Sequence, residues 1–395
     1  MISNKEIFKN SIAQTSESPV MFEPTHAEGL YIFNSANEKY IDLISGISVS
    51  NIGHRHEKVT TAIKEQVDKY LHLMVYGEYI QSPQTDLASK ICSLLPESLN
   101  NIYFVNSGSE AVEGALKIAK KHCNREEVIC FNNAYHGSTL GAISLIGNKE
   151  YVDNYAKCIN NVKRININNI KDLETITTKT ACVIIELIQG EAGIIECEKN
   201  YIKALKARCE ETKTLIIVDE IQTGFGRTGT FFAFEQYDFT PDIITIAKGM
   251  GGGMPIGAFI ANKEIMNCIN NNPVLGHITT FGGHPVSCAA SSATIDVIIK
   301  EKLIETVESK KNKFISLLKH PKIKNIRSKG LLIALDFEDE KTNFEVIKQC
   351  YKNNVLSDWF LFNTTSMRIA PPLTITDEEI ELSCERIIKS INTTI

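Results

Sequence analysis

The sequence predicts an α/β protein built around a mainly parallel sheet. Between about residues 56 and 290, short apolar runs alternate with amphipathic segments. The runs are continuously apolar, which is typical of strands buried on both faces between covering helices. They are IYFV (102–105), VICF (128–131), CVIIEL (182–187), TLIIV (214–218), IITIA (243–247) and IGAFI (256–260).

The length of 395 residues allows two or three structural units. We expect residues 56–290 to form a large domain. After residue 290, a Lys/Glu-rich helical stretch leads to GLLIALDF, VLSD and MRIAPPL, which predicts a smaller α+β domain over residues 291–395. Residues 1–55 are too short to fold alone and are expected to join this small domain. A closing helix is predicted from the capping box Thr376-x-x-Glu379.

Composition excludes several classes of function. The formal net charge is -5 and no basic block occurs, so no nucleic-acid partner is expected. No run approaches the roughly 20 apolar residues of a membrane span, and the N-terminus lacks the apolar core of a signal peptide. A soluble cytoplasmic protein is therefore predicted.

The 11 cysteines form no C-x-x-C motif and are odd in number. We expect buried free thiols in a reducing compartment. His54 and His56 lack a carboxylate or thiol at a matching spacing, so a structural role is favoured and no metal site is predicted.

A phosphate site is predicted after the first apolar run. NSGSEAVEGALKIAKKH (106–122) follows that strand, its alanines recur at helical spacing, and Ser107-x-x-Glu110 is a capping box. The free amides at such a helix start bind anions, with the Ser109 hydroxyl as an extra donor. An ordinary helix cap is the alternative.

Lys248 lies at the end of the strand IITIA, before the glycines of KGMGGGMPIG. Desolvation lowers the pKa of a buried lysine and makes its amine a nucleophile towards carbonyls. A lysine that reaches solvent from the strand end is the alternative.

The stretch TLIIVDEIQTGFGRTG (214–229) contains G-x-G-x-x-G from Gly224 to Gly229. A dinucleotide fingerprint needs its first glycine directly after the strand and a helix behind it. Here Asp219, Glu220 and Gln222 separate the strand from the glycines, and an aromatic, turn-rich segment follows. The pattern therefore disfavours a nicotinamide site and places Asp219 at the carboxyl edge of the sheet.

A phosphate cradle, a strand-end aspartate and a strand-end lysine together match the requirements of pyridoxal phosphate. This cofactor needs an amine for its aldehyde, a carboxylate for its pyridine nitrogen and donors for its phosphate. Tyr135, in NAYHGSTLG just past the strand VICF, offers an aromatic ring to stack on the cofactor.

With these motifs, the chain resembles the class III (subgroup II, acetylornithine/ornithine-type) pyridoxal-phosphate-dependent aminotransferases over nearly its whole length, from GLYIFNSANEKYIDL to MRIAPPLTIT. The resemblance implies a PLP-dependent transferase of fold type I. Its large domain would hold a seven-stranded sheet, its small domain would draw on both termini, and it would work as a homodimer with active sites at the interface.

The resemblance also implies roles for individual residues. Lys248 would bind the cofactor aldehyde covalently and move the proton, and Asp219 would pair with the pyridine nitrogen. Gln222 would meet the phenolic oxygen, with Tyr135 and Ile221 on the two faces of the ring.

The phosphate would lie on Gly108 and Ser109, joined by Thr280 from the partner subunit. Glu186 and Glu191 match acidic positions of the family. Glu191 would pair with Arg368, the carboxylate-binding arginine, and release it when a 2-oxo acid arrives.

Three residues depart from the family pattern. Leu187 replaces a proline, and His284 stands where asparagine is common. Ser138 replaces the arginine that grips the amino donor's α-carboxylate, and a hydroxyl cannot replace a bidentate guanidinium. The resemblance therefore leaves the donor open.

The sequence thus predicts an aminotransferase that moves an amino group from an amine or amino-acid donor to a 2-oxo acid, with 2-oxoglutarate expected, by a ping-pong mechanism. An aminomutase or a decarboxylating transaminase of the same fold is the first alternative function. The two remaining alternatives are an NAD-dependent dehydrogenase and a non-enzymatic binding module.

Overall fold

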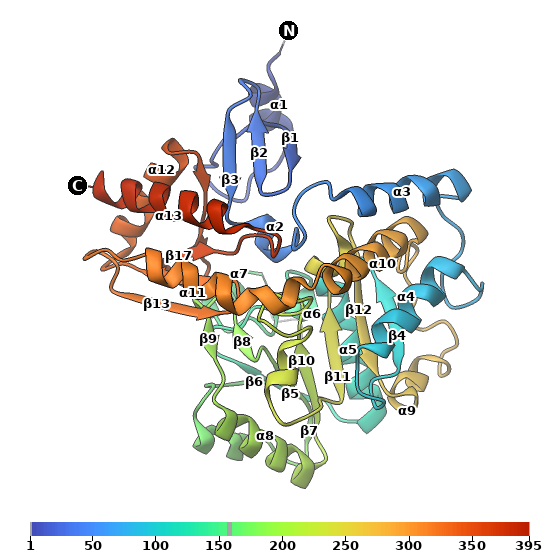
Figure 1. Cartoon of the computed structure of the whole chain (residues 1–395). Helices are drawn as coiled ribbons and strands as arrows, with labels where there is room; N and C mark the ends of the chain where they lie inside the picture. The colour runs from blue at the N-terminus through green and yellow to red at the C-terminus, as the bar shows by residue number, and fades with distance from the viewer. Residues whose placement is uncertain (1, 156–159, 395) are drawn as a thin grey trace.

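The computed structural model describes residues 2–155 and 160–394. Its centre is a seven-stranded sheet in the order β4-β12-β11-β10-β7-β5-β6 (Figure 1). Strand β12 is antiparallel to β11 and β4, and the remaining pairs are parallel, so the predicted α/β class is confirmed. The strands are β4 (Asn101–Val105), β5 (Glu127–Phe131), β6 (Val162–Ile165), β7 (Thr180–Ile185), β10 (Leu215–Asp219), β11 (Ile243–Ile246) and β12 (Gly257–Ala261).

Six of these strands coincide with the apolar runs of the sequence. The seventh, β6, pairs only with β5 at the sheet edge, and its two central residues, Lys163 and Arg164, are charged. Because an edge strand contacts one neighbour and partly faces water, it needs no continuous apolarity. For this reason the sequence shows no continuous apolar run at β6.

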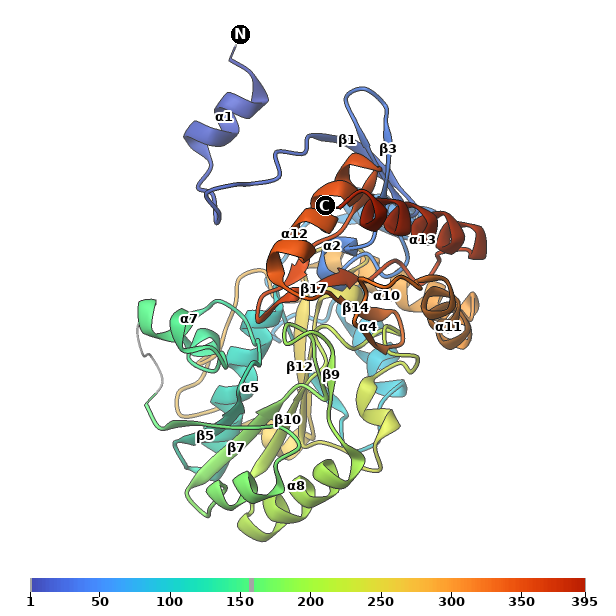
Figure 2. The same cartoon turned by 90° about the vertical axis from the view of Figure 1, so that its left-hand side faces the viewer.

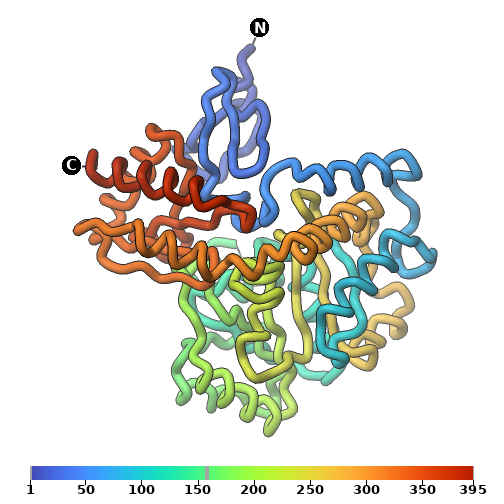
Figure 3. Tube along the Cα trace, viewed as in Figure 1, coloured from blue at the N-terminus to red at the C-terminus, as the bar shows by residue number. Residues whose placement is uncertain are grey.

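Helices cover both faces of the sheet (Figures 1 and 3). Helix α5 (Gly108–Cys123) packs on β11 and β12, and its buried positions include Ala111, Ala115 and Ala119, as the spacing predicted. Helix α8 (Lys199–Thr212) packs beside β10, and α10 (Pro285–Lys300) lies against α3 (Glu57–Lys69) and α4 (Ser82–Ser93).

The two ends of the chain share a second sheet, in the order β1-β2-β3-β15. Strand β3 (Lys39–Asp42) runs parallel to β15 (Val355–Leu356), whereas β1 (Pro24–Glu28) and β2 (Tyr31–Asn34) complete it. Figure 2 shows this N-terminal layer beside the C-terminal helices. A third sheet joins β13 (Asn325–Lys329), β14 (Leu332–Asp336), β17 (Asn363–Ile369) and β16 (Trp359–Phe360).

The remaining elements are short or peripheral, except for three C-terminal helices. These are α11 (Val307–Leu317), α12 (Glu340–Lys352) and α13 (Asp377–Asn392), and α13 begins with the predicted Thr376–Glu379 capping box. The others are α1 (Asn4–Ser11), α2 (Ser45–Ser48), α6 (Leu140–Ile143), α7 (Lys149–Asn154), α9 (Lys263–Met266), β8 (Ile188–Gln189) and β9 (Ile195–Glu196).

The glycine motif forms a turn-rich loop with no α-helix behind it, only the short 3-10 helix η2 (Ala233–Gln236). Arg227 within the loop is fully buried, and its guanidinium donates to the Leu331 carbonyl at 3.1 Å and to Asn51 Oδ1 at 2.6 Å. Burial lowers its pKa to about 9. The loop therefore fastens the large sheet to the C-terminal layer.

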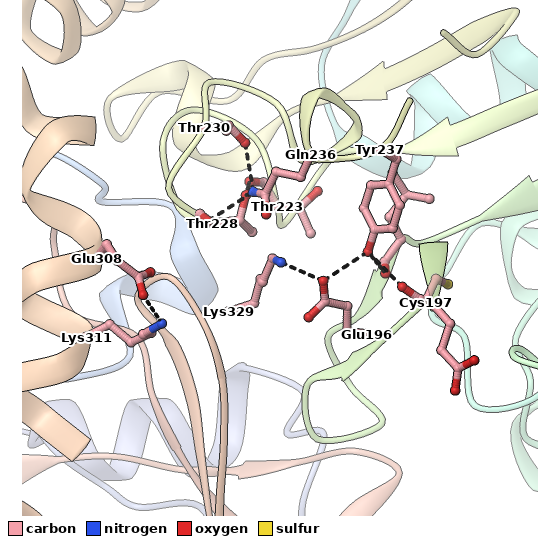
Figure 4. Close-up of polar contacts among 12 residues, drawn as sticks. Glu196, Cys197, Thr223, Thr228, Thr230, Gln236, Tyr237, Glu308, Lys311 and Lys329 are labelled. Atoms are coloured by element: carbon pink, nitrogen blue, oxygen red, sulfur yellow. Dashed lines mark hydrogen bonds and ion pairs between the residues drawn. The ribbon is translucent and has the colours of Figure 1, made fainter. Parts of the chain in front are cut away.

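Further polar contacts hold this loop in place (Figure 4). Gln236 donates to the Thr228 carbonyl at 3.1 Å. The Tyr237 hydroxyl and the Lys329 ammonium both reach Glu196 Oε1, at 3.4 and 2.5 Å. Because Lys329 lies in β13, this chain of contacts again connects the loop with the third sheet.

Within the described residues, the ten cysteines are free thiols, and seven of them are buried. Cys158 lies outside the described residues. His54 Nε2 donates to Asp42 Oδ2 at 2.8 Å, which ties its loop to β3. Among the helices that the structure describes, none has the length and apolarity to cross a membrane, and no cluster of metal-ligating side chains occurs in the same residues.

Candidate active site

A cavity of about 390 Å³ opens at the carboxyl edge of the large sheet. Most of its walls come from segments that directly follow strands, which is where open α/β sheets bind ligands. Nine of the predicted site residues line it. They are Gly108, Ser109, Tyr135, Glu186, Glu191, Asp219, Ile221, Gln222 and Lys248. Ser107, predicted as the helix cap, lines it as well, whereas His136, Val49 and Asn106 were not singled out from the sequence.

The start of α5 forms one end of the cavity. Ser107 caps the helix by accepting from the Glu110 amide at 3.2 Å, as predicted. The Glu110 carboxylate reaches past the cap and accepts from the Asn106 amide at 2.6 Å. The amides of Gly108 and Ser109 have no intrahelical acceptor at these positions, so they are free to bind an anion.

Two glycines keep this end open. A Cβ on Gly108 would approach Ile221 Cδ1 to 2.9 Å, and a Cβ on Gly137 would approach Ser109 Oγ to 2.2 Å. Gly137 also has φ +123°, a conformation that side-chain-bearing residues rarely adopt. The Ser109 hydroxyl accepts from the Ser138 amide at 3.2 Å, which leaves its own proton for an anion.

Asp219 ends β10 and faces His136, which follows β5. The His136 Nδ1 and Asp219 Oδ2 atoms are 2.7 Å apart, and both residues are buried. Burial alone would lower the pKa of His136, but its hydrogen bond to Asp219 and the charge of Asp219 outweigh burial, so the pKa is raised. The hydrogen bond therefore fixes the orientation of the Asp219 carboxylate. The histidine directly after Tyr135 was the available signal in the sequence.

Glu186 lies beside this pair at the end of β7. It accepts from the Tyr135 amide at 3.0 Å and from the Gly190 amide at 3.2 Å. Burial raises the pKa of its carboxyl to about 7. Glu186 thus holds the backbone of Tyr135, the predicted stacking residue, at the cavity wall.

Gln222 carries an unpaired donor. Its side chain is buried, yet Nε2 has no hydrogen-bond partner. A Cβ on Gly190 would approach Gln222 Oε1 to 1.6 Å, so only glycine leaves room for this side chain. An unpartnered buried amide is costly, which indicates that a bound molecule supplies the acceptor.

Lys248 follows β11 and begins the short 3-10 helix η3 (Lys248–Gly251). Its φ of +47° is strained for a residue with a side chain, a feature found at functional sites. Burial lowers the pKa of its amine, although the charge of Glu191 acts in the opposite direction. The amine is therefore closer to its neutral, nucleophilic form than a lysine in water.

Arg368 and Glu191 form the other end of the site. Nη1 and Nη2 of Arg368 donate to the two carboxylate oxygens of Glu191, each at 2.9 Å, and both side chains are buried. Burial alone would raise the pKa of Glu191, but the charge of Arg368 outweighs it and the pKa is lowered. Asp358, which sequence reasoning did not identify, accepts from Arg368 Nε at 2.8 Å.

Three predicted residues do not line the cavity. Arg368 stands behind Glu191, and Ser138 is exposed, its hydroxyl 3.1 Å from that of Tyr135. Thr280 is exposed as well, next to Thr279, which accepts from Asn106 Nδ2 at 2.9 Å. His284 does not reach the cavity either; its ring stacks on that of His72, with centroids 5.6 Å apart.

The residues present fit pyridoxal phosphate on their own chemistry. The free amides of α5 suit a phosphate, and the Asp219 carboxylate suits a protonated ring nitrogen. The unpartnered Gln222 Nε2 suits a phenolic oxygen, and the Lys248 amine suits an aldehyde. These four groups all line the one cavity.

Comparisons with known proteins agree with this reading. The family model "Aminotransferase class-III" matches residues 12–391. The acetylornithine aminotransferase of Archaeoglobus fulgidus is 36% identical over 95% of this chain and 97% of its own. A [LysW]-aminoadipate semialdehyde/glutamate semialdehyde transaminase of Sulfolobus acidocaldarius is 34% identical over 90% of both chains.

Solved structures that resemble the chain include aminotransferases too. The ornithine aminotransferase of Toxoplasma gondii ME49 superimposes with a TM-score of 0.90 at 28% identity, over 98% of this chain and 93% of its own. An (S)-enantioselective omega-transaminase of Thermomicrobium roseum gives a TM-score of 0.92 at 25% identity, over 99% and 98%. The chain belongs to the class-III aminotransferase family, and it is a pyridoxal-phosphate-dependent enzyme that transfers amino groups.

Proposed function

We propose that this enzyme takes an amino group from an amine donor and passes it to 2-oxoglutarate, through the residues that line the cavity. The observation that carries the proposal is that Lys248, Asp219 and Glu191 line one cavity, with Arg368 paired to Glu191 directly behind its wall. The first two serve a cofactor-dependent transfer, and the third serves recognition of a carboxylate.

In this proposal each residue has one task. When bound, pyridoxal phosphate supplies an aldehyde that condenses with amines and a ring that accepts the electrons released at the donor carbon. Gly108 and Ser109 hold the phosphate. Asp219, fixed by His136, keeps the ring nitrogen protonated. Lys248 would take the proton from the amine-bearing carbon of the donor and deliver it to the carbon that carried the aldehyde oxygen of the cofactor.

The remaining cofactor contacts follow from the cavity walls. Tyr135 and Ile221 enclose the ring from its two faces, and Gln222 donates Nε2 to its phenolic oxygen. Glu186 keeps the Tyr135 backbone in place. These assignments are proposals that rest on the positions of the side chains.

Arg368 is proposed to bind the carboxylate of 2-oxoglutarate. Glu191 occupies the Nη1/Nη2 edge of its guanidinium in the structure, so the two carboxylates compete for one site. When the 2-oxo acid leaves, Glu191 returns and the buried arginine stays neutralised. This exchange allows one site to accept both a 2-oxo acid and a donor without an α-carboxylate.

Position 138 sets the donor. Relatives are named for acetylornithine or for aminoadipate semialdehyde and glutamate semialdehyde. Ser138 offers a hydroxyl that already contacts Tyr135 and no positive charge. We therefore expect a donor recognised at its reacting amine end or by other groups of the pocket, with acetylornithine and ornithine as poor donors.

The working unit is proposed to be a homodimer. Thr280 is exposed and lies off its own cavity wall, as expected of a residue that reaches the partner's phosphate. Segments 71–80 and 274–281, here called the apolar surface, carry exposed side chains such as Ile80 (94% exposed) and Val274 (74%). The His72 and Phe281 rings connect the two segments, with centroids 4.9 Å apart. Exposed apolar surface of this kind marks an interaction site.

Sedimentation of the purified protein tests the homodimer. We expect a dimer, and Ile80→Asp should weaken it and lower activity. Ile170→Asp is the matched control, because Ile170 is also exposed (57%) but lies away from the apolar surface. A fully active wild-type monomer would contradict the proposal.

We also propose that residues 1–55 and 291–395 form a small domain and residues 56–290 a large one. The shared sheet of β3 and β15 supports the first grouping, whereas α10 runs across the boundary at residue 290. A cytoplasmic location is proposed as well, since the free cysteines suit a reducing compartment.

The experiment that tests the function is a pair of half-reactions followed by absorption of the bound cofactor. The holoenzyme is mixed with single amines and amino acids, and the converted enzyme is then mixed with 2-oxoglutarate. We expect 2-oxoglutarate to restore the starting spectrum. An enzyme that converts its substrate without exchanging an amino group with 2-oxoglutarate would instead be an aminomutase or a decarboxylating enzyme.

A further inference from the structure

Arg368 contacts two carboxylates, and only one of them can be exchanged from the cavity. Glu191 lines the cavity, whereas Asp358 does not. Asp358 precedes strand β16, and its side chain accepts from Arg368 Nε at 2.8 Å. Its backbone carbonyl accepts from the Arg368 amide at 2.8 Å, so the two residues are joined through both side chain and main chain.

The contacts divide the guanidinium into two sides. Its Nη1/Nη2 edge faces Glu191, with two hydrogen bonds of 2.9 Å. On the other side, Nε donates to Asp358 and Nη2 donates to the Trp359 carbonyl at 3.1 Å. The Phe360 ring lies against the guanidinium, 4.6 Å from its carbon to the ring centroid. Among the described residues, segment 358–360 therefore supplies the hydrogen bonds and the ring contact of the guanidinium that remain when Glu191 leaves.

Glu191 is held so that its side chain can leave while its backbone stays. The Phe362 amide donates to the Glu191 carbonyl at 3.0 Å, and the Leu361 amide donates to its carboxylate at 3.1 Å. The first contact anchors the loop, and only the second must break with the two to Arg368. Residues 358–360 contact Arg368, and the following turn, residues 361–362, contacts Glu191, so one short segment of the chain contacts both partners of the pair.

Without a second partner, Arg368 would bind an entering carboxylate weakly. The positive charge of its buried guanidinium would be uncompensated after Glu191 leaves, and its long side chain could adopt several rotamers. An entering carboxylate would then have to order the arginine as well as bind it. A partner at Nε removes both costs, because it neutralises the charge and fixes the plane of the guanidinium.

We propose that Asp358 is a positioning residue for substrate recognition. It holds Arg368 by Nε, so that the Nη1/Nη2 edge stays turned towards the cavity while Glu191 and the carboxylate of the 2-oxo acid exchange. This role rests on the proposed binding of 2-oxoglutarate by Arg368. It adds a specificity determinant that directly precedes β16, a strand of two residues.

The test compares Asp358→Asn with Asp358→Leu and Asp358→Ser in the 2-oxoglutarate half-reaction. Asparagine keeps an oxygen acceptor at the same distance from the backbone. The loss of charge affects Glu191 and the carboxylate of 2-oxoglutarate, which compete for Arg368, in the same way. The KM of the asparagine variant for 2-oxoglutarate should therefore stay within about threefold of the wild type. Leucine lacks the acceptor and serine cannot reach, so each should raise KM by about tenfold or more, as expected for a lost hydrogen bond to a charged group. Their kcat should change much less.

Asp336→Leu is the matched control. Asp336 pairs with Arg327 on the neighbouring strands β13 and β14, away from the cavity. Its loss should affect stability but leave KM unchanged. Serine serves as the second variant in case the leucine protein does not fold.

Two outcomes would overturn the role of Asp358. Either the serine and leucine variants keep the wild-type KM, or the asparagine variant loses as much as they do, in which case charge and not position matters. The reaction with an amine that lacks a carboxylate should be normal in all variants. A wild-type enzyme that does not react with 2-oxoglutarate at all would instead refute the proposed function.

Discussion

The two ends of the active site are built in different ways. At the cofactor end, each side chain stands within a few residues of a strand end in one sheet; Asp219 is the last residue of β10, and Lys248 follows β11. At the carboxylate end, Glu191 and Arg368 are 177 residues apart and meet only because the third sheet lies over the loop after β7. The first end depends on local sequence, and the second depends on how the parts of the chain pack.

This difference teaches how the two halves of the reaction can be separated. In the proposed roles, every substrate uses the cofactor end, whereas only a substrate with a suitably placed carboxylate uses Arg368. Substitutions at the cofactor end should therefore abolish both half-reactions. Substitutions at the carboxylate end should affect one of them.

The largest effect is expected from Lys248→Ala. The variant loses the amine that is proposed both to bind the cofactor aldehyde and to move the proton. Turnover should therefore fall by at least about 10²-fold, and by up to about 10⁴-fold or more. Steady-state rates with both substrates, and the visible absorption of the bound cofactor, measure it. Comparable turnover in the variant would show that Lys248 is not the catalytic amine.

Asp219→Asn should give the next largest effect. The amide keeps the shape of the site, but it cannot stabilise a protonated ring nitrogen, and His136 loses its charged partner. Removal of such an electrostatic contact costs on the order of 10²-fold or more in rate. Single-turnover deamination of a donor measures the loss, with the melting temperature as the control for folding. A near-normal single-turnover rate would rule out the assignment.

Arg368→Ala should separate the two half-reactions. Loss of the charged partner of a buried carboxylate costs about 2–5 kcal/mol, which corresponds to roughly 30-fold or more in the 2-oxoglutarate half-reaction. The reaction with an amine that lacks an α-carboxylate should change far less. Arg368→Lys is the control that keeps a charge without the bidentate geometry. Equal losses with both substrates would contradict a dedicated carboxylate site.

The sequence predicted most of the cofactor end and only part of the carboxylate end. Lys248 and Asp219 could be located because the end of an apolar run in the sequence predicts the end of a buried strand. His136 was missed, since its contact with Asp219 spans two strand ends on either side of β7. Asp358 was missed because its contact depends on the pairing of β16 with β17, where the register shifts between Trp359 and Phe360. No periodicity in the sequence encodes that shift.

Ser138→Arg should have the smallest effect on the common chemistry and change the donor. Ser138 is exposed beside the cavity, so an arginine there has room to extend. A bidentate guanidinium would grip the α-carboxylate of ornithine or acetylornithine, an interaction that improves their reaction by about tenfold.

The substitution should lower the rate of the common reaction little, because the cofactor contacts stay as they are. The contact that it removes is the hydrogen bond between the hydroxyls of Ser138 and Tyr135. Ser138→Lys is the control, since a point charge cannot make the paired contact and should improve these donors less. The rates of the donor half-reaction measure both variants, and the 2-oxoglutarate half-reaction should stay unchanged. If the wild-type enzyme already uses acetylornithine as well as any other amine tested, then another residue supplies the grip and Ser138 does not set the donor.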